Sequence, residues 1–387
     1  MSAPRRSGII NSTIANYERG KFCENQSSVT HAKGEPFVIE EVELAEPKFD
    51  EILVRVVASG ICHTDLVCRD QFIPVPLPAV LGHEGAGIVE KVGFGVTEFQ
   101  PGDRVGITFA SCGVCPCCKK GKPYVCKNLN KINFGGIQAD GTSRLSTLDG
   151  QKLSTFFGQS SFATYAVVNQ RNAVKVEYDD IDLSVVAPIG CGIQTGAGAV
   201  LNRLRPEFGS TIAVYGCGTV GMSAIMAAKI AGCAKIIAVG GNPKSLELAK
   251  ELGATHTVNR KECDEVAAVR ELTGGGVNYA IDTTGVGACV RKSLAMCDFD
   301  GTCVVVGATG DLTINVQAEL MGDGKSLIGV LEGDSVPKDF IPKLIEYYHD
   351  GRFPIDRLMK VYPFEKINEA VEESTSGKCI KAVLKME

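Results

Sequence analysis

The 387-residue sequence predicts an α/β protein that joins a β-rich domain to a doubly wound, six-stranded parallel sheet. Before residue 190, short β-branched runs such as EILVRVVASG (51–60) and AGIVEKVG (86–93) alternate with Gly- and Pro-rich turns. This pattern is typical of an irregular, mostly antiparallel β domain. From about residue 209, apolar strands alternate with helical stretches, which is the pattern of a parallel sheet with crossover helices.

Six segments of the second half have the composition of strands and are separated by helical patterns. The predicted strands are 211–216, 234–240, 255–259, 278–285, 301–308 and 325–333, and the predicted helices between them are 219–232, 243–253, 263–273 and 288–297. A further helix is expected over 337–351. Because the sheet is then complete, we expect the C-terminal tail to return to the first domain. The expected division is 1–191 with 335–387, and 192–334.

The bulk properties indicate a globular protein that acts on small molecules. Hydrophobic residues make up 44% of the chain, charged residues 22%, and the net charge is −5. The sequence has no long basic stripe, so a nucleic-acid partner is not expected. It has no run of eighteen apolar residues, so a membrane span is not expected. The first twenty residues lack the apolar core of a secretory signal, so we expect a cytoplasmic protein. In that compartment disulfides are rare, and clustered cysteines are more often metal ligands.

The stretch GCGTVG (216–221) follows a predicted strand and opens a predicted helix, which is the context of a dinucleotide-binding loop. Gly216 would permit the tight turn, Gly218 the approach of the pyrophosphate, and Gly221 close packing of helix on strand. Thr219 and Val220 complete the expected loop, whose free N–H groups would face the phosphates. The alternative is a plain structural turn between strand and helix.

The end of the second predicted strand indicates which nucleotide is bound. An NAD-binding protein is expected to carry Asp or Glu there, on the ribose 2′-hydroxyl. This strand ends in Gly240, Gly241 and Asn242 instead, and Lys244 and Ser245 follow. Glycine leaves room for a 2′-phosphate that a carboxylate would repel, so the sequence favours NADP over NAD. The alternative is that Gly240 belongs to a tolerant turn.

The stretch SCGVCPCCKKGKPYVC (111–126) predicts a metal site. Its Cys112, Cys115, Cys118 and Cys126 could supply four thiolates to a closed, tetrahedral structural zinc ion. Disulfides, surface thiols and an iron–sulfur cluster are the alternatives. Cys117 has no assigned part.

Three scattered segments, GICHTD (60–65), GHEGAG (82–87) and IGCGIQTG (189–196), each carry one potential metal ligand. Taken singly, His83 could be a structural histidine, and Cys62 and Cys191 could be small buried residues. Together they offer two sulfurs and one nitrogen, the ligand set of a catalytic zinc ion with an open fourth position.

The sequence resembles the zinc-dependent medium-chain alcohol dehydrogenases. GHEGAGIVEKVGFGV (82–96) fits the family signature G-H-E-x2-G-x5-G-x2-V, and the four-cysteine loop and GCGTVG stand in the family's order. PFEKINEAVE (363–372) is also similar, and ADGTSRLSTLDGQ (139–151) looks like the aryl-alcohol and class-III-like long-loop branches. The resemblance covers about residues 35 to 387. It implies a GroES-like catalytic domain built from both chain ends and a Rossmann domain.

The resemblance also implies residue roles. Cys62, His83 and Cys191 would hold the catalytic zinc ion. The other implied roles are an acid near the metal at Glu84, a carboxylate orienting the histidine at Asp65, a proton-passing hydroxyl at Thr64, and cofactor contacts at His63, Thr195 and Lys381. Two positions carry residues that differ from those of many relatives. Val67 stands where many relatives have a relay histidine, and Thr108 stands near an aromatic pocket residue of relatives.

The expected function is zinc-dependent hydride transfer between a primary alcohol, including aromatic or bulky ones, and NADP, or the reverse reduction of the aldehyde or ketone. Two Zn²⁺ per chain are expected, with NADP(H) favoured over NAD(H). The alternatives are an NAD-dependent S-(hydroxymethyl)glutathione dehydrogenase and a non-catalytic structural protein that keeps the fold. Relatives pair through the last strands of the Rossmann sheet, so a homodimer or homotetramer is expected.

Overall fold

The computed structural model describes residues 25–386, which form two compact units. The first unit contains the described residues up to Lys119, then 126–190, and those from Lys360 onward. The second contains 120–125 and 191–359. The N-terminal segment from which a cytoplasmic location was predicted lies outside the described residues. The functional division of the chain near residues 191 and 335 stays a prediction.

The first unit is built from two sheets, and the antiparallel pairing expected from the sequence is confirmed. The first sheet has the strand order β4 (Ala79–Val80), β1 (Asn25–Thr30), β2 (Val38–Leu44), β7 (Leu145–Thr147) and β8 (Lys152–Leu153). The second has the order β10 (Ala173–Lys175), β6 (Arg104–Ile107), β5 (Gly85–Val92), β3 (Glu51–Gly60), β18 (Lys381–Lys385) and β17 (Met359–Pro363), with β9 (Tyr165–Asn169) also paired to β3.

Strand β3 lies between two hydrophobic clusters because its side chains alternate between its faces. Ile52, Val54 and Val56 belong to a cluster that includes residues of β5, β6 and β9. Leu53 belongs to a second cluster, formed mainly by residues of β1, β2, β7 and β8. A strand with two apolar faces is therefore the centre of this unit.

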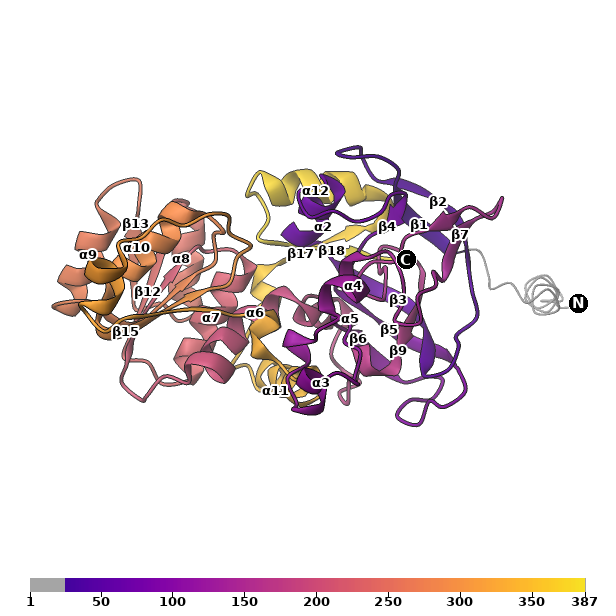
Figure 1. The fold of residues 1–387 in the computed structure, drawn as a ribbon, viewed down its shortest axis with the longest axis horizontal. Coiled ribbons are helices and arrows are strands. Elements are labelled where there is room, and N and C mark those ends of the chain that lie inside the picture. The colour runs from indigo at the N-terminus through magenta and orange to yellow at the C-terminus, as the bar shows by residue number, and fades with distance from the viewer. Residues whose placement is uncertain (1–24, 387) are drawn as a thin grey trace, which may run out of the picture. The chain divides into compact units, whose positions relative to one another are not determined.

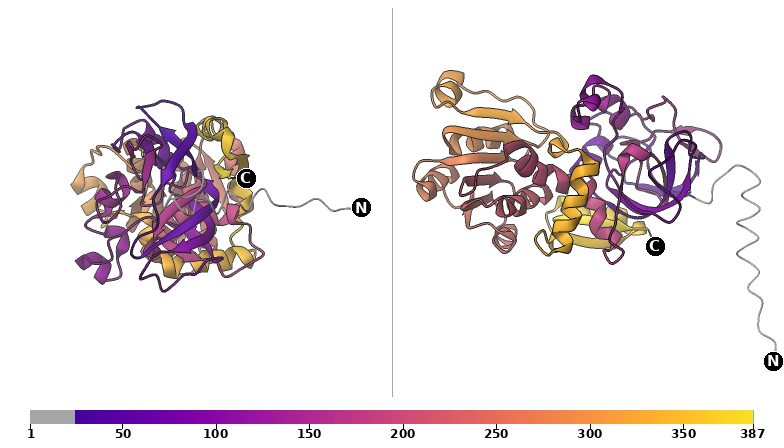
Figure 2. Two further views of the ribbon diagram at one scale, coloured as in Figure 1. Left: turned by 90° about the vertical axis from the view of Figure 1, so that its right-hand side faces the viewer. Right: turned by 90° about the horizontal axis from the view of Figure 1, so that it is seen from below.

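The C-terminal segment returns to the first unit, because β18 pairs antiparallel with β3, with Val383 opposite Gly60. Figure 2 (right) shows this yellow strand beside the indigo and magenta part of the chain. The helices of the unit are α2 (His63–Arg69), α3 (Pro116–Lys119), α4 (Leu129–Phe134), α5 (Leu183–Val186) and α12 (Ile367–Thr375).

The second unit contains a six-stranded, all-parallel sheet, as the sequence predicts. Its order is β13 (His256–Asn259), β12 (Lys235–Gly240), β11 (Thr211–Tyr215), β14 (Val277–Asp282), β15 (Cys297–Val305) and β16 (Ser326–Gly329). The helices are α6 (Gly192–Gly198), α7 (Thr219–Ile230), α8 (Pro243–Leu252), α9 (Glu265–Thr273), α10 (Gly287–Met296) and α11 (Pro337–His349). Helices α8, α9 and α10 pack along the sheet (Figure 1).

The strand order reverses at β11, because the two strands that flank it, β12 and β14, both come later in the chain. Open parallel sheets bind ligands at such a point, beyond the carboxyl ends of the strands. Within residues 25–386, no single helix has the length and apolar composition to cross a membrane; only the bent pair Leu183–Gly190 and Gly192–Leu204 passes, by length and composition alone.

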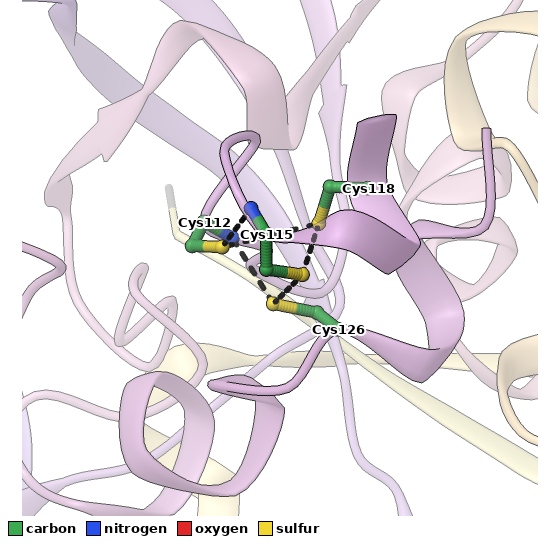
Figure 3. A group of neighbouring side chains, drawn as sticks. All are labelled: Cys112, Cys115, Cys118 and Cys126. Atoms are coloured by element: carbon green, nitrogen blue, oxygen red, sulfur yellow. Dashed lines mark hydrogen bonds between the residues drawn. The ribbon is translucent and has the colours of Figure 1, made fainter. Parts of the chain in front are cut away.

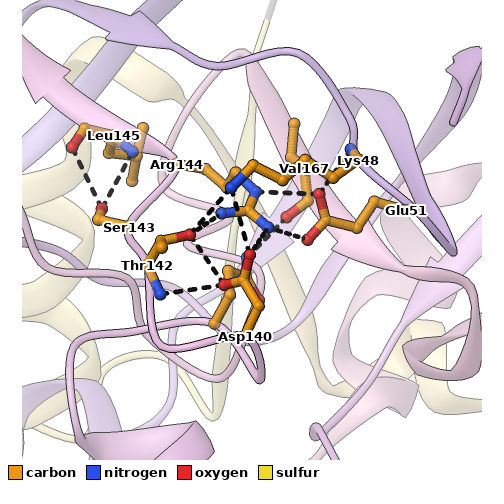
Figure 4. A network of polar contacts seen from close by, with 9 residues as sticks. Lys48, Glu51, Asp140, Thr142, Ser143, Arg144, Leu145 and Val167 are labelled. Atoms are coloured by element: carbon orange, nitrogen blue, oxygen red, sulfur yellow. Dashed lines mark hydrogen bonds and ion pairs between the residues drawn. The ribbon is translucent and has the colours of Figure 1, made fainter.

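A buried ion pair joins two distant parts of the first unit (Figure 4). The Arg144 guanidinium donates to both carboxylate oxygens of Glu51, at 2.6 and 2.9 Å, and these residues are only 3% and 5% exposed. A third bond, of 2.9 Å, reaches Asp140, and a fourth reaches Thr142. Glu51 begins β3 and Arg144 precedes β7, so the pair connects the 137–150 loop to the central strand. A buried charge needs such partners because its desolvation is costly.

We expect Arg144→Met to lower the free energy of unfolding by about 3–5 kcal/mol, because it leaves the Glu51 carboxylate buried without its partner. Arg55→Met is the control, since Arg55 pairs with Glu90 at 2.8 Å in a pair that is more than one-third exposed. Its expected cost is about 0–1 kcal/mol. Chemical denaturation of both variants measures the difference, and equal losses would contradict the assignment.

Candidate active site and structural metal site

The four cysteines of the 112–126 loop gather around one point in the first unit (Figure 3). The Sγ atom of Cys118 lies 3.5 Å from that of Cys115 and 4.0 Å from that of Cys112. Cys115 and Cys126 are 4.0 Å apart. A tetrahedral zinc ion with Zn–S bonds of about 2.3 Å gives S···S edges of about 3.8 Å. The spacing therefore fits one zinc ion, is too wide for disulfide bonds and leaves no room for a cluster of iron atoms.

Backbone N–H groups of this loop donate to the sulfurs and favour the thiolate form of Cys115 most. Hydrogen bonds from the backbone at Cys118 and Lys127 lower the pKa of the Cys115 thiol to about 6. The Cys126 sulfur accepts from the backbone N–H groups of Cys112 and Asn128, both at 3.4 Å. The loop thus has the ligands, the spacing and the N–H donors of a structural zinc site.

Helix α2 positions the first residue of the second ligand set. Cys62 is its N-cap residue, in an extended conformation, and the Asp65 carboxylate accepts from the Cys62 backbone N–H at 2.9 Å. This is the backward half of a capping box, in which the third helical residue satisfies the N-cap amide. The helix start therefore fixes both Cys62 and Asp65.

Asp65 also binds the segment that carries His83. Its other oxygen, Oδ1, lies 2.8 Å from Nδ1 of His83 and accepts from the Gly82 N–H at 3.1 Å. Asp65 and His83 are both fully buried. Burial opposes protonation of His83, yet the negative charges of Asp65 and Cys62 hold its pKa well above the usual value. Surroundings that favour a proton also favour a metal cation at Nε2, which is buried and has no hydrogen-bond partner among the described residues.

Three phenylalanines surround the His83 ring. Phe157 stacks on it with a centroid separation of 4.5 Å, and Phe156 meets it edge-on at 5.4 Å. Phe134, from α4, contacts both of these rings, at 5.1 and 6.0 Å. Two aromatic rings therefore pack directly on the imidazole, and the third packs behind them. Nothing in the sequence pattern predicted this enclosure.

Glu84 forms a buried ion pair with Lys381, whose ammonium group also donates to the Ile61 carbonyl at 2.9 Å. Burial raises the pKa of Glu84 to about 7, against the opposing charge of Lys381. Lys381 is 2% exposed. The sequence predicted a cofactor contact for Lys381, and the structure places it beside the His83 segment; the cofactor contact stays a prediction.

Cys191 directly follows Gly190, the last residue of this stretch of the first unit, so the chain itself fixes where it lies. The hydroxyl of Thr108 donates to the Gly190 carbonyl at 2.8 Å. A Cβ atom on Gly190 would lie 2.1 Å from the Ile107 carbonyl oxygen, so only glycine fits there. Thr108, predicted to lie near the substrate pocket, is fully buried and supports the segment before Cys191.

The predicted catalytic ligands come together. One ligand atom from each of Cys62, His83, Glu84 and Cys191 lies within 4.8 Å of the others. Two sulfurs, one imidazole nitrogen and a nearby carboxylate are donors typical of a catalytic zinc site. Thr64 lies beside this group, with its Oγ1 3.7 Å from the Cys62 sulfur. His63 is exposed on α2, and Val67 is half-buried.

In the second unit, the GCGTVG loop has a geometric need for its glycines. Gly216 has a φ of +105°, which favours glycine, and a Cβ atom on Gly221 would lie 1.8 Å from the Gly216 carbonyl oxygen. The Cβ position of Gly218 faces open space within 4 Å. Helix α7 begins at Thr219, directly after Gly218, and the N-terminus of a helix favours an anion. Thr195 lies in α6, where its N–H donates to the Cys191 carbonyl at 2.9 Å.

Cationic side chains lie at the carboxyl end of β12. A Cβ atom on Gly241 would lie 3.1 Å from Cε of Lys261 and 3.2 Å from Nε of Arg260. Both are exposed, as is Lys244. Asn242 caps α8, accepting from the Lys244 N–H at 3.0 Å. Lys244 is one of the predicted cofactor residues, whereas Arg260 and Lys261, which follow β13 and reach this edge through parallel pairing, were not predicted.

Comparisons with known proteins agree with this geometry. Residues 219–348 match the family "Zinc-binding dehydrogenase" and residues 48–178 match "Alcohol dehydrogenase GroES-like domain". The chain is 43% identical to geraniol dehydrogenase from Castellaniella defragrans over 367 residues, which are 94% of this chain and 98% of that enzyme.

Two solved structures are similarly close. One is an alcohol dehydrogenase zinc-binding domain protein from Burkholderia ambifaria, with a TM-score of 0.92 at 48% identity over 94% of this chain and 99% of that one. The other is benzyl alcohol dehydrogenase from Acinetobacter calcoaceticus, with a TM-score of 0.91 at 43% identity over 95% and 100%.

The fold and the two ligand sets define a zinc-dependent, dinucleotide-binding oxidoreductase. The chain belongs to the zinc-containing medium-chain alcohol dehydrogenases, and it is similar to the geraniol and benzyl alcohol dehydrogenases of that family. It is therefore an enzyme, as expected from the sequence, and the alternative of a non-catalytic structural protein is wrong.

We expect two zinc ions per chain in the purified protein, measured by elemental analysis. Cys115→Ser should remove one of them and lower stability, because four-thiolate sites contribute directly to folding. Cys62→Ser should remove the other and abolish turnover while leaving dinucleotide affinity unchanged. Cys117→Ser is the matched control in the same loop and should keep both ions. Equal zinc contents in all three variants would refute the two-site assignment.

Proposed function

We propose that this chain transfers a hydride between NADP(H) and primary alcohols whose carbinol carbon adjoins a double bond or an aromatic ring, and that it reduces the matching aldehydes in reverse. The observation that carries the proposal is the cluster of Cys62, His83 and Cys191 beside an aromatic enclosure. Geraniol is an allylic alcohol and benzyl alcohol an aromatic one, and both names belong to relatives of this chain.

Cys62, His83 and Cys191 would hold the catalytic ion, and Cys112, Cys115, Cys118 and Cys126 the structural one. When bound, zinc lowers the pKa of an alcohol and the nicotinamide accepts a hydride. Asp65 keeps the Nδ1 side of His83 occupied, so that Nε2 is directed to the metal. Glu84 lies among the ligands but is paired with Lys381, so we assign it the role of a nearby acid.

Thr64 is the proposed first acceptor of the alcohol proton. Its hydroxyl lies at the Cys62 sulfur, on the first turn of α2. One helical turn further on, Val67 offers no titratable group, so the proton would leave through solvent or the exposed His63. His63 is also proposed to contact the cofactor pyrophosphate, and Thr195 the nicotinamide.

The aromatic enclosure favours flat, unsaturated substrates. Phe157 and Phe156 lie buried against His83, with Phe134 packed on both, and we propose that a substrate bound near His83 meets this aromatic lining. Such rings attract other π systems through offset or edge-to-face contacts, worth about 0.5–1.5 kcal/mol beyond area burial. A saturated short alcohol would gain little from them.

The experiment that tests this function is a panel of benzyl, cinnamyl, allylic and short aliphatic alcohols, with their aldehydes. We expect kcat/KM to be at least tenfold higher for the allylic and aromatic members than for ethanol. Phe157→Ala should narrow that ratio by about three- to tenfold, since about 0.5–1.5 kcal/mol of ring contact is lost. Equal kcat/KM values across the panel, or a higher kcat/KM for aliphatic alcohols, would refute the substrate class.

The proposed preference for NADP rests on charge at the end of β12. No carboxylate ends this strand, while Arg260 and Lys261 lie against Gly241. No ion pair of these two side chains is found within residues 25–386. A 2′-phosphate would gain charge-assisted hydrogen bonds there, and the 2′-hydroxyl of NAD would not.

We expect Arg260→Ala to raise KM for NADP by about tenfold or more, since hydrogen bonds to charged groups contribute about 1.5–3 kcal/mol. KM for NAD should change less than twofold. Lys250→Ala, an exposed cation elsewhere on α8, is the control and should alter neither constant. Equal effects of Arg260→Ala on both nucleotides would contradict the assignment, and a higher kcat/KM with NAD in the parent enzyme would remove the NADP proposal.

We also propose a homodimer, or a tetramer made of such dimers, formed at strand β16. Among the strands of residues 25–386, this one is an edge of the parallel sheet and pairs only with β15. Large apolar side chains near it are exposed, among them Leu331 at 52%, Met321 at 65% and Phe299 at 72%. An open edge beside apolar surface is suited to pairing with a second copy.

A further inference from the structure

The turn at residues 156–162 lies tightly against the segment that carries His83. The Ser161 N–H donates to the Gly82 carbonyl at 2.9 Å, and the Phe162 N–H to that of Leu81 at 3.1 Å. A Cβ atom on Gly82, whose φ is +89°, would lie 2.3 Å from the Phe162 nitrogen. The two backbones are therefore in direct contact.

One side chain of this turn, Gln159, joins the backbone at His83 and just after it to the backbone of Thr108. Its amide nitrogen donates to the His83 carbonyl at 2.8 Å and to the Thr108 carbonyl at 3.2 Å. Its oxygen Oε1 accepts from the Gly85 N–H at 3.2 Å. Gln159 is 2% exposed, so water cannot readily replace these hydrogen bonds when the side chain is changed.

The turn around Gln159 is held in an unfavourable conformation. Phe157 has a φ of +51° and Ser160 a φ of +54°, values that non-glycine residues rarely adopt. The Phe157 N–H donates to the Asn133 carbonyl at 2.9 Å, and the Phe156 N–H to the Ser160 hydroxyl at 2.9 Å. Such conformations persist where the surroundings enforce them, and they concentrate at functional sites.

This conformation is what lays the Phe157 ring on the His83 ring, 4.5 Å away and inclined by 30°. Gln159 thus holds the backbone of the histidine, while Phe157 of the same turn contacts its imidazole. Asp65 adds the contact at Nδ1, so the backbone, the ring face and Nδ1 of His83 are each restrained by a different partner.

We propose that Gln159 is a positioning residue of the catalytic centre, which holds His83 so that Nε2 stays directed at the metal. This inference rests on the proposed role of His83 as a zinc ligand. The competing explanation is that Gln159 contributes only to stability, as any buried and fully bonded glutamine does.

A matched control separates the two explanations. Gln170 is 7% exposed and lies in the same unit; its amide donates to Asp50 at 2.9 Å and to the Gly95 carbonyl at 3.4 Å, and it accepts from the Thr97 N–H at 3.3 Å. None of its partners is a predicted metal ligand or a neighbour of one. Gln159→Met and Gln170→Met therefore remove similar bonds in different places.

The measurement is zinc release into a chromophoric chelator, with the absorption spectrum of the cobalt-substituted protein. For Gln159→Met we expect one of the two zinc ions to bind 10- to 100-fold more weakly, with an altered cobalt spectrum. The four-cysteine zinc and the affinity for NADP(H) should be unchanged. Gln170→Met should lose stability to a similar extent and show parent-like zinc release, cobalt spectrum and kcat.

Zinc release and cobalt spectra that are the same in both variants would overturn the inference. His83→Ala tests the assumption beneath it: if that variant keeps two tightly bound zinc ions, the proposed ligand set is wrong. If His83→Ala loses one ion while Gln159→Met behaves like the parent, only the role of Gln159 is wrong. Gln159→Glu, which keeps the shape of the side chain and the acceptor to Gly85 but no donor when ionised, replaces Gln159→Met if that variant does not fold.

Discussion

The catalytic centre depends on one buried carboxylate, that of Asp65. It accepts hydrogen bonds from the backbone N–H groups of Cys62 and Gly82, and it lies 2.8 Å from Nδ1 of His83. A carboxylate with no exposed surface is stable only when its oxygens are bonded. Because this buried carboxylate needs hydrogen bonds, it joins the start of α2 to the segment that carries His83, some twenty positions further along the chain.

The charges around this centre call for a cation. Asp65, Glu84 and the thiolates of Cys62 and Cys191 would carry four negative charges, and Lys381 supplies one positive charge. Buried like charges repel strongly in a low dielectric. A divalent ion relieves that repulsion, so metal binding and the packing of this part of the first unit should be coupled.

Local sequence patterns predicted the fold and the four-cysteine set, because spacing along the chain determines them, whereas the scattered catalytic set rested on the family resemblance. The strands of the parallel sheet, the glycines of 216–221 and the four-cysteine loop all follow from neighbouring residues. The residues that support the site were not predicted, because their partners lie far away along the chain. Arg144 and Glu51 are 93 positions apart, and Gln159 and His83 are 76 apart. No periodicity or composition marks such partners before the chain is folded.

The glycine at the end of β12, where a nucleotide is proposed to bind, can be explained in two ways. The sequence suggests that Gly240 leaves room for a phosphate. A Cβ atom there would lie 3.0 Å from the Cys217 sulfur and 3.3 Å from Cδ2 of Leu246, so packing alone also favours glycine at this position. The missing carboxylate is therefore weak support for NADP by itself. The stronger support is Arg260 and Lys261, which the parallel pairing of β12 with β13 brings to the same edge. Cationic groups attract a phosphate whatever the reason for the glycine beside them.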